Sequence, residues 1–334
     1  MPVDKRPGWY TFTPFLGRPP PLTARQWRVL GLVASVSFFE MYDMYLFTLN
    51  LKQIQADLMI AEGDLGLLGS FVRAGGLLGV IPALLADRVG RRRMLLITVI
   101  AYTLLTGATA FSPNAESFVV LQFFARGFAV AETILATVVI VEEFAPEHRG
   151  WGVGAAGAIQ ASGAGLASVM YGFVEILPFG WRSLYLIGLL PLVLIAYWRR
   201  ALPETERFQQ QQTRQRRQGI PTGMLHNVVL LLRHYPGRFW ALASAVFTTT
   251  MAASAAAFFA PKYLQDVHGW TPANVAVLAF IGGAFAIIGN PLAGWLSDRH
   301  GRRPITAIFA AGPESAPCCS TTCPGVFFQY SGCC

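Results

Sequence analysis

Eight long stretches of apolar residues are the feature that most constrains how this chain of 334 residues folds. A transmembrane helix needs about 20 consecutive, mostly apolar residues to cross roughly 30 Å of hydrocarbon. Charged residues make up only 13% of the chain, whereas an ordinary globular protein has about 25%. The sequence therefore predicts an all-α integral membrane protein with eight full transmembrane helices, over residues 29–51, 65–86, 94–111, 118–141, 151–176, 181–198, 239–262 and 273–297.

The placement of the basic residues predicts the orientation of these helices. Loops on the cytoplasmic side of a membrane are enriched in Lys and Arg. With the N-terminus on that side, 21 of the 26 basic residues fall in cytoplasmic segments and three in external ones. The net charge of +8 thus marks topology, and its spread over separate loops does not indicate nucleic-acid binding. We expect a multi-pass protein in the lipid bilayer of a cell membrane. In a bacterium this would be the inner membrane.

A polar segment between the sixth and seventh spans divides the chain. A ninth apolar run begins at Ile305 but stops at Ala311, and all five cysteines follow it. This last part cannot continue a span, and we expect it to result from a frameshift or a truncated gene. The predicted parts are a cytoplasmic tail (1–28), a six-helix N-terminal bundle (29–198), a cytoplasmic connecting loop (199–238), an incomplete C-terminal bundle (239–311) and an aberrant Cys-rich tail (312–334).

The same charged turn occurs once in each half. Its pattern is D-R-x-G-R-R, and the two copies are offset by 211 residues. Glycine permits a sharp reversal of the chain, and the arginines hold the turn in the cytoplasm. Two equivalent copies favour two parallel halves over a simple stop-transfer turn. The turn residues are Asp87, Arg88, Gly90, Arg91 and Arg92 in the first copy, and Asp298, Arg299, Gly301, Arg302 and Arg303 in the second.

These turns resemble the G-x-L-x-D-R-x-G-R-R motif of the major facilitator superfamily. The second copy matches throughout, and the first has Ala83 in place of the first glycine. The run E-E-F-A-P-E-H-R-G from Glu142 is similar to a turn of sugar porters and metabolite–proton symporters. The run F-F-E-M-Y-D-M-Y from Phe38 resembles F-F-E-W-Y-D-F-Y of metabolite–proton symporters, and P-E-T-E-R-F from Pro203 resembles the sugar-porter sequence P-E-S-P-R.

The resemblance covers about residues 27–311 and implies a major-facilitator-like helix bundle. Such a protein has twelve spans around a central site, of which this chain would hold eight and a partial ninth. The resemblance implies a secondary active transporter that works by alternating access. Its expected substrate is a small polar organic solute (a sugar, an organic acid or a similar metabolite), carried by proton symport that uses Asp43 or Glu40 and Arg126. The fifth span lacks the G-P-x-x-G-G element of drug–proton antiporters, which favours symport or uniport. A non-functional fragment and a non-transporting membrane sensor on the same fold stay open as alternatives.

Five ionisable side chains lie well inside the predicted spans, away from their ends, where such groups are costly and mark functional sites. Asp43, Arg73 and Arg126 each lie eight residues from the outer end of their span, roughly 12 Å deep. Glu40 lies one turn deeper than Asp43 on the same helix face, and Glu132 lies near the midplane. A carboxylate beside an arginine stays ionised until the pair separates, which would couple a proton to a substrate. A static ion-pair network that only positions helices is the alternative.

The histidines and cysteines give no sign of a catalytic or metal centre. None of them shows a metal-ligand spacing, and no nucleophile motif, phosphate-binding loop or dinucleotide fingerprint is present. We therefore expect no metal, no cofactor and no enzyme activity. The expected partners are a small-molecule substrate and protons, and the expected state is a monomer.

Overall fold

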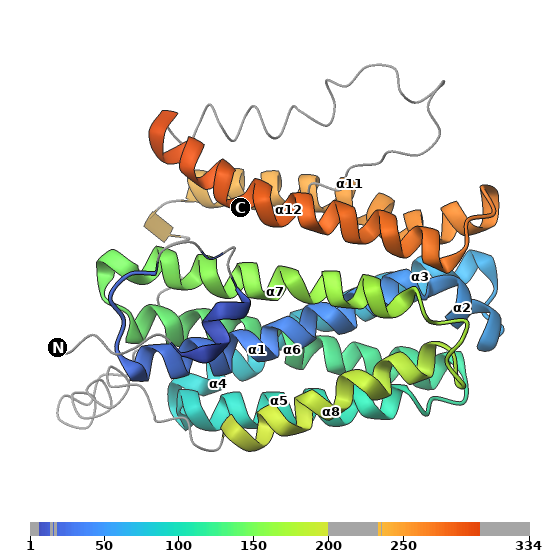
Figure 1. Ribbon diagram of the computed structural model, residues 1–334, viewed down its shortest axis with the longest axis horizontal. Coiled ribbons are helices and arrows are strands. Elements are labelled where there is room, and N and C mark those ends of the chain that lie inside the picture. The colour runs from blue at the N-terminus through green and yellow to red at the C-terminus, as the bar shows by residue number, and fades with distance from the viewer. Residues whose placement is uncertain (1–6, 14–15, 17–18, 200–232, 235, 301–334) are drawn as a thin grey trace.

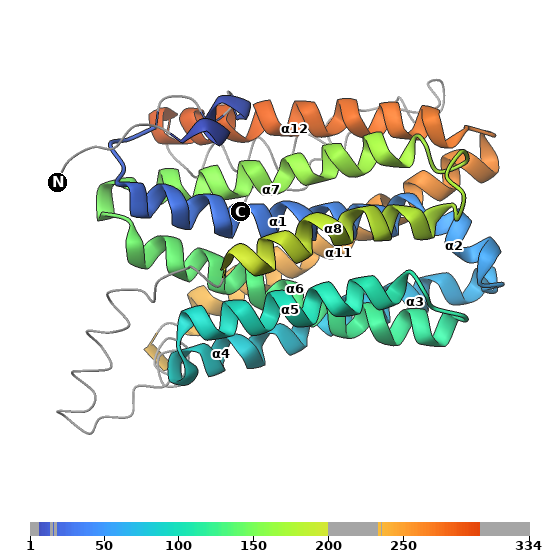
Figure 2. The same ribbon diagram turned by 60° about the horizontal axis from the view of Figure 1, so that its bottom comes forward.

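The computed structural model describes residues 7–13, 16, 19–199, 233–234 and 236–300. These residues form a bundle of long helices that run along one common axis (Figures 1 and 2). No strand occurs in this part of the chain. The elements are η1 (Gly8–Phe12), α1 (Ala24–Leu49), α2 (Leu51–Asp57), η3 (Glu62–Asp64), α3 (Leu65–Ala74), η4 (Gly75–Gly79), α4 (Val80–Val89), α5 (Arg91–Thr109), α6 (Ala115–Glu143), η5 (Pro146–His148), α7 (Arg149–Tyr171), α8 (Trp181–Arg199), α11 (Pro236–Val267) and α12 (Pro272–His300).

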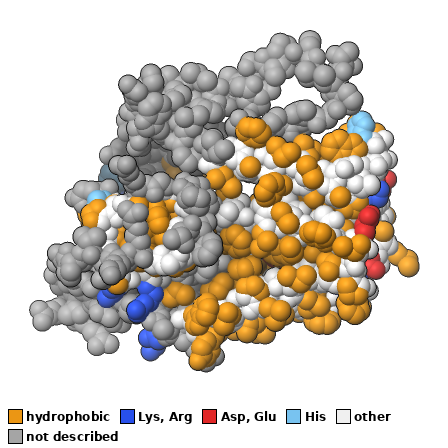
Figure 3. Space-filling model, in the orientation of Figure 1, with side chains coloured by type: hydrophobic (Ala, Val, Ile, Leu, Met, Phe, Trp, Pro, Cys, Tyr) orange, Lys and Arg blue, Asp and Glu red, His pale blue; other side chains and the backbone are white. Residues whose placement is uncertain are grey.

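Five of the described helical segments are long and apolar enough to cross a membrane. They are α1, the segment Glu62–Ala86, α6, α7 and α8 up to Trp198. Helix α5 begins with three arginines and is not among them. Hydrophobic side chains cover much of the outer surface, and the charged groups in view lie toward the two ends of the bundle (Figure 3). The predicted all-α membrane fold is confirmed.

Polar caps make two helices start earlier than hydropathy predicts. Thr23 precedes α1, where its hydroxyl accepts a hydrogen bond from the Gln26 amide at 3.3 Å. The Gln26 side chain in turn accepts from the Thr23 amide at 3.0 Å, which completes a capping box. Asn114 and Ser117 form the same box before α6. The helices therefore begin at Ala24 and Ala115 rather than at residues 29 and 118, because capping residues are polar and fall outside an apolar stretch.

The second predicted span is not one regular helix, because a 3₁₀ segment, η4, separates α3 from α4. This segment crosses α6 at backbone contact. A Cβ on Gly75 would lie 2.1 Å from the carbonyl oxygen of Phe123, and one on Gly79 would lie 2.8 Å from that of Gly127. Small residues permit such close approach between membrane helices. The crossing places Arg73, in the last turn of α3, beside α6.

Helix α1 lies inside the bundle and packs against α6, α7 and α8. Its contact with α7 is also at backbone distance, since a Cβ on Gly163 would lie 2.0 Å from the carbonyl oxygen of Phe38. The Tyr42 side chain joins α1 to α8, where its hydroxyl donates a hydrogen bond to the Leu184 carbonyl at 3.0 Å. Both carboxylates of α1, Glu40 and Asp43, are consequently buried.

The first charged turn reverses the chain between α4 and α5. Gly90 has φ +109°, a conformation that favours glycine, as its place in the turn predicts. Arg91 is buried, where it donates to the Ala86 carbonyl at 3.1 Å and forms an ion pair with Glu142 at 3.2 Å. We call this end of the bundle, with the Arg91–Glu142 pair, the inner end, and the opposite end the outer end.

Several predictions fall on parts of the chain that the structure does not describe. The side chains of Asp87 and Arg88 are outside the described part, although their backbone lies in α4. Asp298 and Arg299 lie in α12, again without described side chains. The other predicted features outside it are Gly301, Arg302, Arg303, most of the connecting loop (200–232), the ninth apolar run (305–311) and the Cys-rich tail (312–334).

Helices α11 and α12 belong to the second half of the sequence. They lie along one side of the first six spans, with α12 against α7 (Figures 1 and 2). Helix α11 begins at Pro236, earlier than the predicted residue 239, and continues through Pro261 to Val267. The outer part of α11 contacts α1 and α2, and this contact brings a side chain of the second half to the interior site.

Candidate functional site

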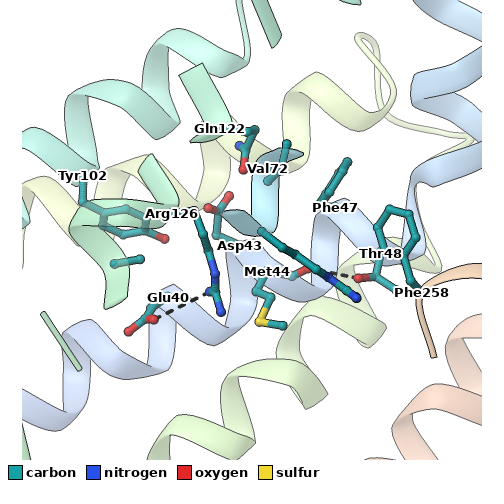
Figure 4. Close-up of a pocket in the computed structure, with 12 residues that line it drawn as sticks. Glu40, Asp43, Met44, Phe47, Thr48, Val72, Tyr102, Gln122, Arg126 and Phe258 are labelled. Carbon is teal, nitrogen blue, oxygen red and sulfur yellow. Dashed lines mark hydrogen bonds and ion pairs between the residues drawn. The ribbon is translucent and has the colours of Figure 1, made fainter. Parts of the chain in front are cut away.

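A pocket inside the bundle brings together four of the five ionisable residues that the sequence singles out. Glu40, Asp43, Arg73 and Arg126 all line it (Figure 4). It holds about 450 Å³ of empty space, which includes the part open to solvent. The other lining residues are Met44, Phe47, Thr48, Val72, Tyr102, Gln122, Ala129 and Phe258, so that α1, α3, α5, α6 and α11 all contribute.

Arg126 of α6 lies beside both carboxylates of α1. Its Nη1 atom is 3.9 Å from Glu40 Oε1. Glu40 Oε2 accepts a 2.6 Å hydrogen bond from the Thr133 hydroxyl. Asp43 lies near Arg126 and beside the hydroxyls of Tyr102 and Thr106, and its Oδ1 atom has no hydrogen-bond partner within the described part of the chain. The pocket thus holds a buried carboxylate oxygen that can accept a proton or a hydrogen bond from a ligand.

Arg73 extends into the pocket from α3 and lies over an aromatic ring. Its Cζ atom is 4.9 Å from the ring centroid of Phe258, within the range of a cation–π contact. Phe258 also packs against Phe47, with ring centroids 5.3 Å apart. Gly69 leaves room for the ring, because a Cβ there would lie 2.6 Å from it. Sequence reasoning missed Phe258, since nothing in an apolar span distinguishes one phenylalanine from its neighbour Phe259.

Glu132, the fifth candidate, does not line this pocket. It is fully buried, and its Oε2 atom accepts a 2.8 Å hydrogen bond from the Thr98 hydroxyl of α5. Glu132 is near Glu40 but lies outside the pocket that the other four residues line, and its role stays a prediction. In the described part of the chain no group of three or more His, Cys, Asp or Glu residues is placed to hold a metal ion.

Ion pairs join α11 to the first half of the chain at the outer end. Lys262, whose side chain is only 9% exposed, lies 3.0 Å from Glu62 and also pairs with Asp266. Lys52 lies 2.8 Å from Asp266. Burial opposes ionisation of Asp266, but hydrogen bonds from the two lysines hold its pKa below its ordinary value. Asp266 therefore stays ionised at neutral pH and keeps its ion pairs with the two lysines. Phe258 lies one turn before Lys262 on the same helix.

The sequence of the chain matches the model of a known protein family. The sequence model of the Major Facilitator Superfamily matches residues 33–314. The chain belongs to the major facilitator superfamily. This family consists of membrane transporters and not of enzymes, and the chain is accordingly a multi-pass membrane protein.

The chain is similar to three bacterial carriers of organic acids. It is 25% identical over 295 residues to the cis,cis-muconate transport protein of Acinetobacter baylyi, with 86% of this chain and 70% of the relative covered. It is 27% identical over 319 residues to the 4-hydroxybenzoate transporter of Pseudomonas aeruginosa, with the same coverage. It is 26% identical over 327 residues to the gallate transporter of Pseudomonas putida, with 86% and 69% covered.

Two solved structures show the same fold. A bacterial homologue of the lysosomal transporter Spinster, inward-facing and unoccupied, superposes with a TM-score of 0.65 at 20% identity over 84% of this chain. A D-xylose–proton symporter gives a TM-score of 0.64 at 15% identity over 87% of this chain. The chain spans 64% of the first structure's length and 76% of the second's. The major-facilitator-like helix bundle predicted from the turns is confirmed.

Proposed function

We propose that this chain carries a small organic acid, in its anionic form, across the membrane together with a proton. The observation that supports this function is the set of charges around the pocket, two carboxylates (Glu40 and Asp43) and two guanidiniums (Arg73 and Arg126). When all four are ionised their charges cancel. A substrate carboxylate adds one negative charge, and a proton on Glu40 or Asp43 offsets it. Because an uncompensated buried charge is costly, the acid and the proton are expected to bind together.

The chemistry of the pocket favours an organic acid over a sugar. An arginine fork binds a carboxylate through two parallel hydrogen bonds, and both arginines line the same space. Phe47, Tyr102 and Phe258 add aromatic surface on which a planar substrate can lie. The names of the three relatives agree, since muconate, 4-hydroxybenzoate and gallate are all planar organic acids. A sugar is supported only by the fold shared with the xylose symporter.

The orientation of the carrier belongs to the same proposal. The inner end holds Arg91 and the exposed Arg92 and Arg93, and we place it, with the N-terminus, in the cytoplasm of a bacterial cell. The ion pairs of Lys262 close the outer end between the two halves. Alternating access would break them while the charged turns at Asp87 and Asp298 close the inner end. The carrier is proposed to work as a monomer.

Uptake by the full chain in proteoliposomes tests the function. We expect radiolabelled 4-hydroxybenzoate or gallate to accumulate when the interior is alkaline, and a protonophore to abolish this accumulation. Xylose serves as the competing substrate class. Accumulation of xylose but of no acid would overturn the substrate assignment. Binding of an acid without any accumulation would favour the non-transporting sensor, and neither binding nor transport would favour the non-functional fragment.

Asp43→Asn is expected to lose proton-driven accumulation. Asparagine has nearly the same shape but no charge, so the pocket of D43N carries one negative charge fewer. A substrate carboxylate then balances the two arginines without a proton on Glu40, and transport is no longer coupled to protons. We expect a decrease of at least about 100-fold in pH-gradient-driven uptake, while exchange of labelled for unlabelled acid at equal pH continues. Asp64→Asn, at an exposed outer position, is the matched control. Unchanged coupling in D43N at normal expression would remove Asp43 from the mechanism.

A further inference from the structure

A second cavity lies next to the proposed site, toward the inner end of the bundle. It is formed by α1, α6 and α7 and holds about 390 Å³ of empty space, which includes the part open to solvent. Its wall carries neutral polar groups, the hydroxyls of Ser37, Thr133 and Thr137 and the amide of Gln160. None of its lining residues is ionisable, so it offers no charge to hold a substrate anion. Four neutral polar groups in an otherwise apolar wall can hydrogen-bond water but cannot balance the charge of an organic acid.

The carboxyl group of Glu40 lies at the boundary between the two cavities. Oε1 faces Arg126 in the charged pocket at 3.9 Å. Oε2 accepts the 2.6 Å hydrogen bond from Thr133. Glu40 lines only the charged pocket and Thr133 only the neutral cavity. The two oxygens of one buried carboxylate therefore face different spaces, and the Thr133 hydroxyl is the contact between them.

The geometry of α6 explains this arrangement. Thr133 follows Arg126 by seven residues, which is close to two full turns, so both side chains leave the same face of the helix. Glu132 follows Arg126 by six residues and is turned away by roughly 120°. The charged groups near Glu40 are Arg126 and Glu132 from α6 and Asp43 from its own helix. The lining residues that α7 contributes to the neutral cavity, Val153, Ala156, Gly157 and Gln160, carry no charge.

We propose that Thr133 is the positioning residue that directs the proton of Glu40 into the neutral cavity, away from the pocket where the substrate carboxylate binds. This inference rests on the proton symport proposed above. A hydroxyl can accept one hydrogen bond while it donates another. When Glu40 is protonated, its O–H at Oε2 donates to Thr133 Oγ1, and the Thr133 hydroxyl donates its hydrogen to water in the cavity. Transfer of one proton along this chain leaves the Glu40 carboxylate ionised and paired with Arg126, and leaves the extra proton on water.

Two routes through the same carrier follow from this assignment. The acid leaves the guanidiniums through the charged pocket, and the proton leaves Glu40 through the Thr133 hydroxyl into the neutral cavity. Thr137 lies one turn closer to the inner end, where its hydroxyl donates to the Thr133 carbonyl at 3.0 Å. Because that hydroxyl contacts backbone and not Glu40, its loss should not change the orientation of the carboxylate.

Thr133→Val tests the proposal, with Thr133→Ser and Thr137→Val as matched variants. Valine keeps the shape of threonine and removes only the hydroxyl. We expect T133V to slow pH-gradient-driven uptake of the labelled acid by about tenfold or more, as for loss of a hydrogen bond to a charged group. Exchange at equal pH should stay within about twofold, because it needs no net proton release. T133S should restore driven uptake, T137V should resemble the wild type, and the pH profile of uptake should move only in T133V.

Three outcomes would overturn the assignment of Thr133. Driven uptake in T133V equal to that of the wild type would show that the hydroxyl is not needed. An equal loss of exchange and driven uptake in both T133V and T133S, with unchanged melting temperatures, would show that the side chain serves substrate passage. A T137V variant as uncoupled as T133V would show that the contact with Glu40 is not the cause. If the wild type itself exchanges the acid but never accumulates it with a pH gradient, the proposed proton symport fails instead.

Discussion

Replacing Arg126 by glutamine is expected to abolish uptake of organic acids. Arg126 lies 3.9 Å from Glu40 and lines the pocket together with Asp43. Its loss leaves two buried carboxylates with one fewer positive charge and removes a fork that can hold the substrate carboxylate. Because Glu40 and Asp43 are buried, the remaining uncompensated charge is costly, and we expect a loss of at least about 100-fold in the uptake rate, which is an increase of about 3 kcal/mol in the barrier. The measurement is initial uptake of labelled acid by proteoliposomes.

Two control variants accompany Arg126→Gln. Arg126→Lys keeps the positive charge but not the planar fork, so we expect it to recover only part of the uptake. Arg28→Gln removes an arginine from the exposed surface of α1 and should leave uptake unchanged. Wild-type uptake in R126Q at equal expression would show that the Arg126–Glu40 pair is a static contact between helices, and the proposed site would have to be abandoned.

Gly163→Ala is expected to destabilise the helix bundle strongly. The new Cβ would lie 2.0 Å from the Phe38 carbonyl oxygen, where no side-chain rotation can relieve the clash. Helices α1 and α7 would have to separate, which we expect to cost about 3 kcal/mol. The predicted result is a clear decrease in the melting temperature of the purified protein. Uptake should also fall, because Phe38 lies two residues before Glu40.

Gly154→Ala is the matched control for this prediction. It lies on the same helix, and a Cβ there meets nothing within 4 Å. Alanine is favoured over glycine inside a helix by about 1 kcal/mol, so G154A should melt at the same temperature as the wild type or slightly higher. If G163A and G154A had the same melting temperature, helices α1 and α7 would not approach each other as closely as the structure shows.

Some of the site could be predicted because depth along a helix is a local property. Asp43, Arg73 and Arg126 lie at equal distances from the outer ends of their spans, and the structure has all three around one pocket. Depth does not specify direction around the helix axis. Glu132 lies six residues deeper than Arg126 on the same helix and is turned toward Thr98 on α5. The seven-residue spacing between Arg126 and Thr133 is visible in the sequence, but nothing in the sequence marks this threonine as a residue of the site.

The sequence by itself determined that the chain is a bundle of membrane helices with the major facilitator turns. Apolar length, the positions of arginines and the glycine of a turn act within a few residues, and these local preferences survive in the structure, as Gly90 shows. Only the tertiary structure decided which oxygen of Glu40 faces Arg126 and which faces Thr133, and that Phe258 of the second half covers the pocket. Those contacts depend on how closely helices approach, through Gly75, Gly163 and Gly69. Helix packing of this kind joins residues far apart in the chain, so no local pattern reports it.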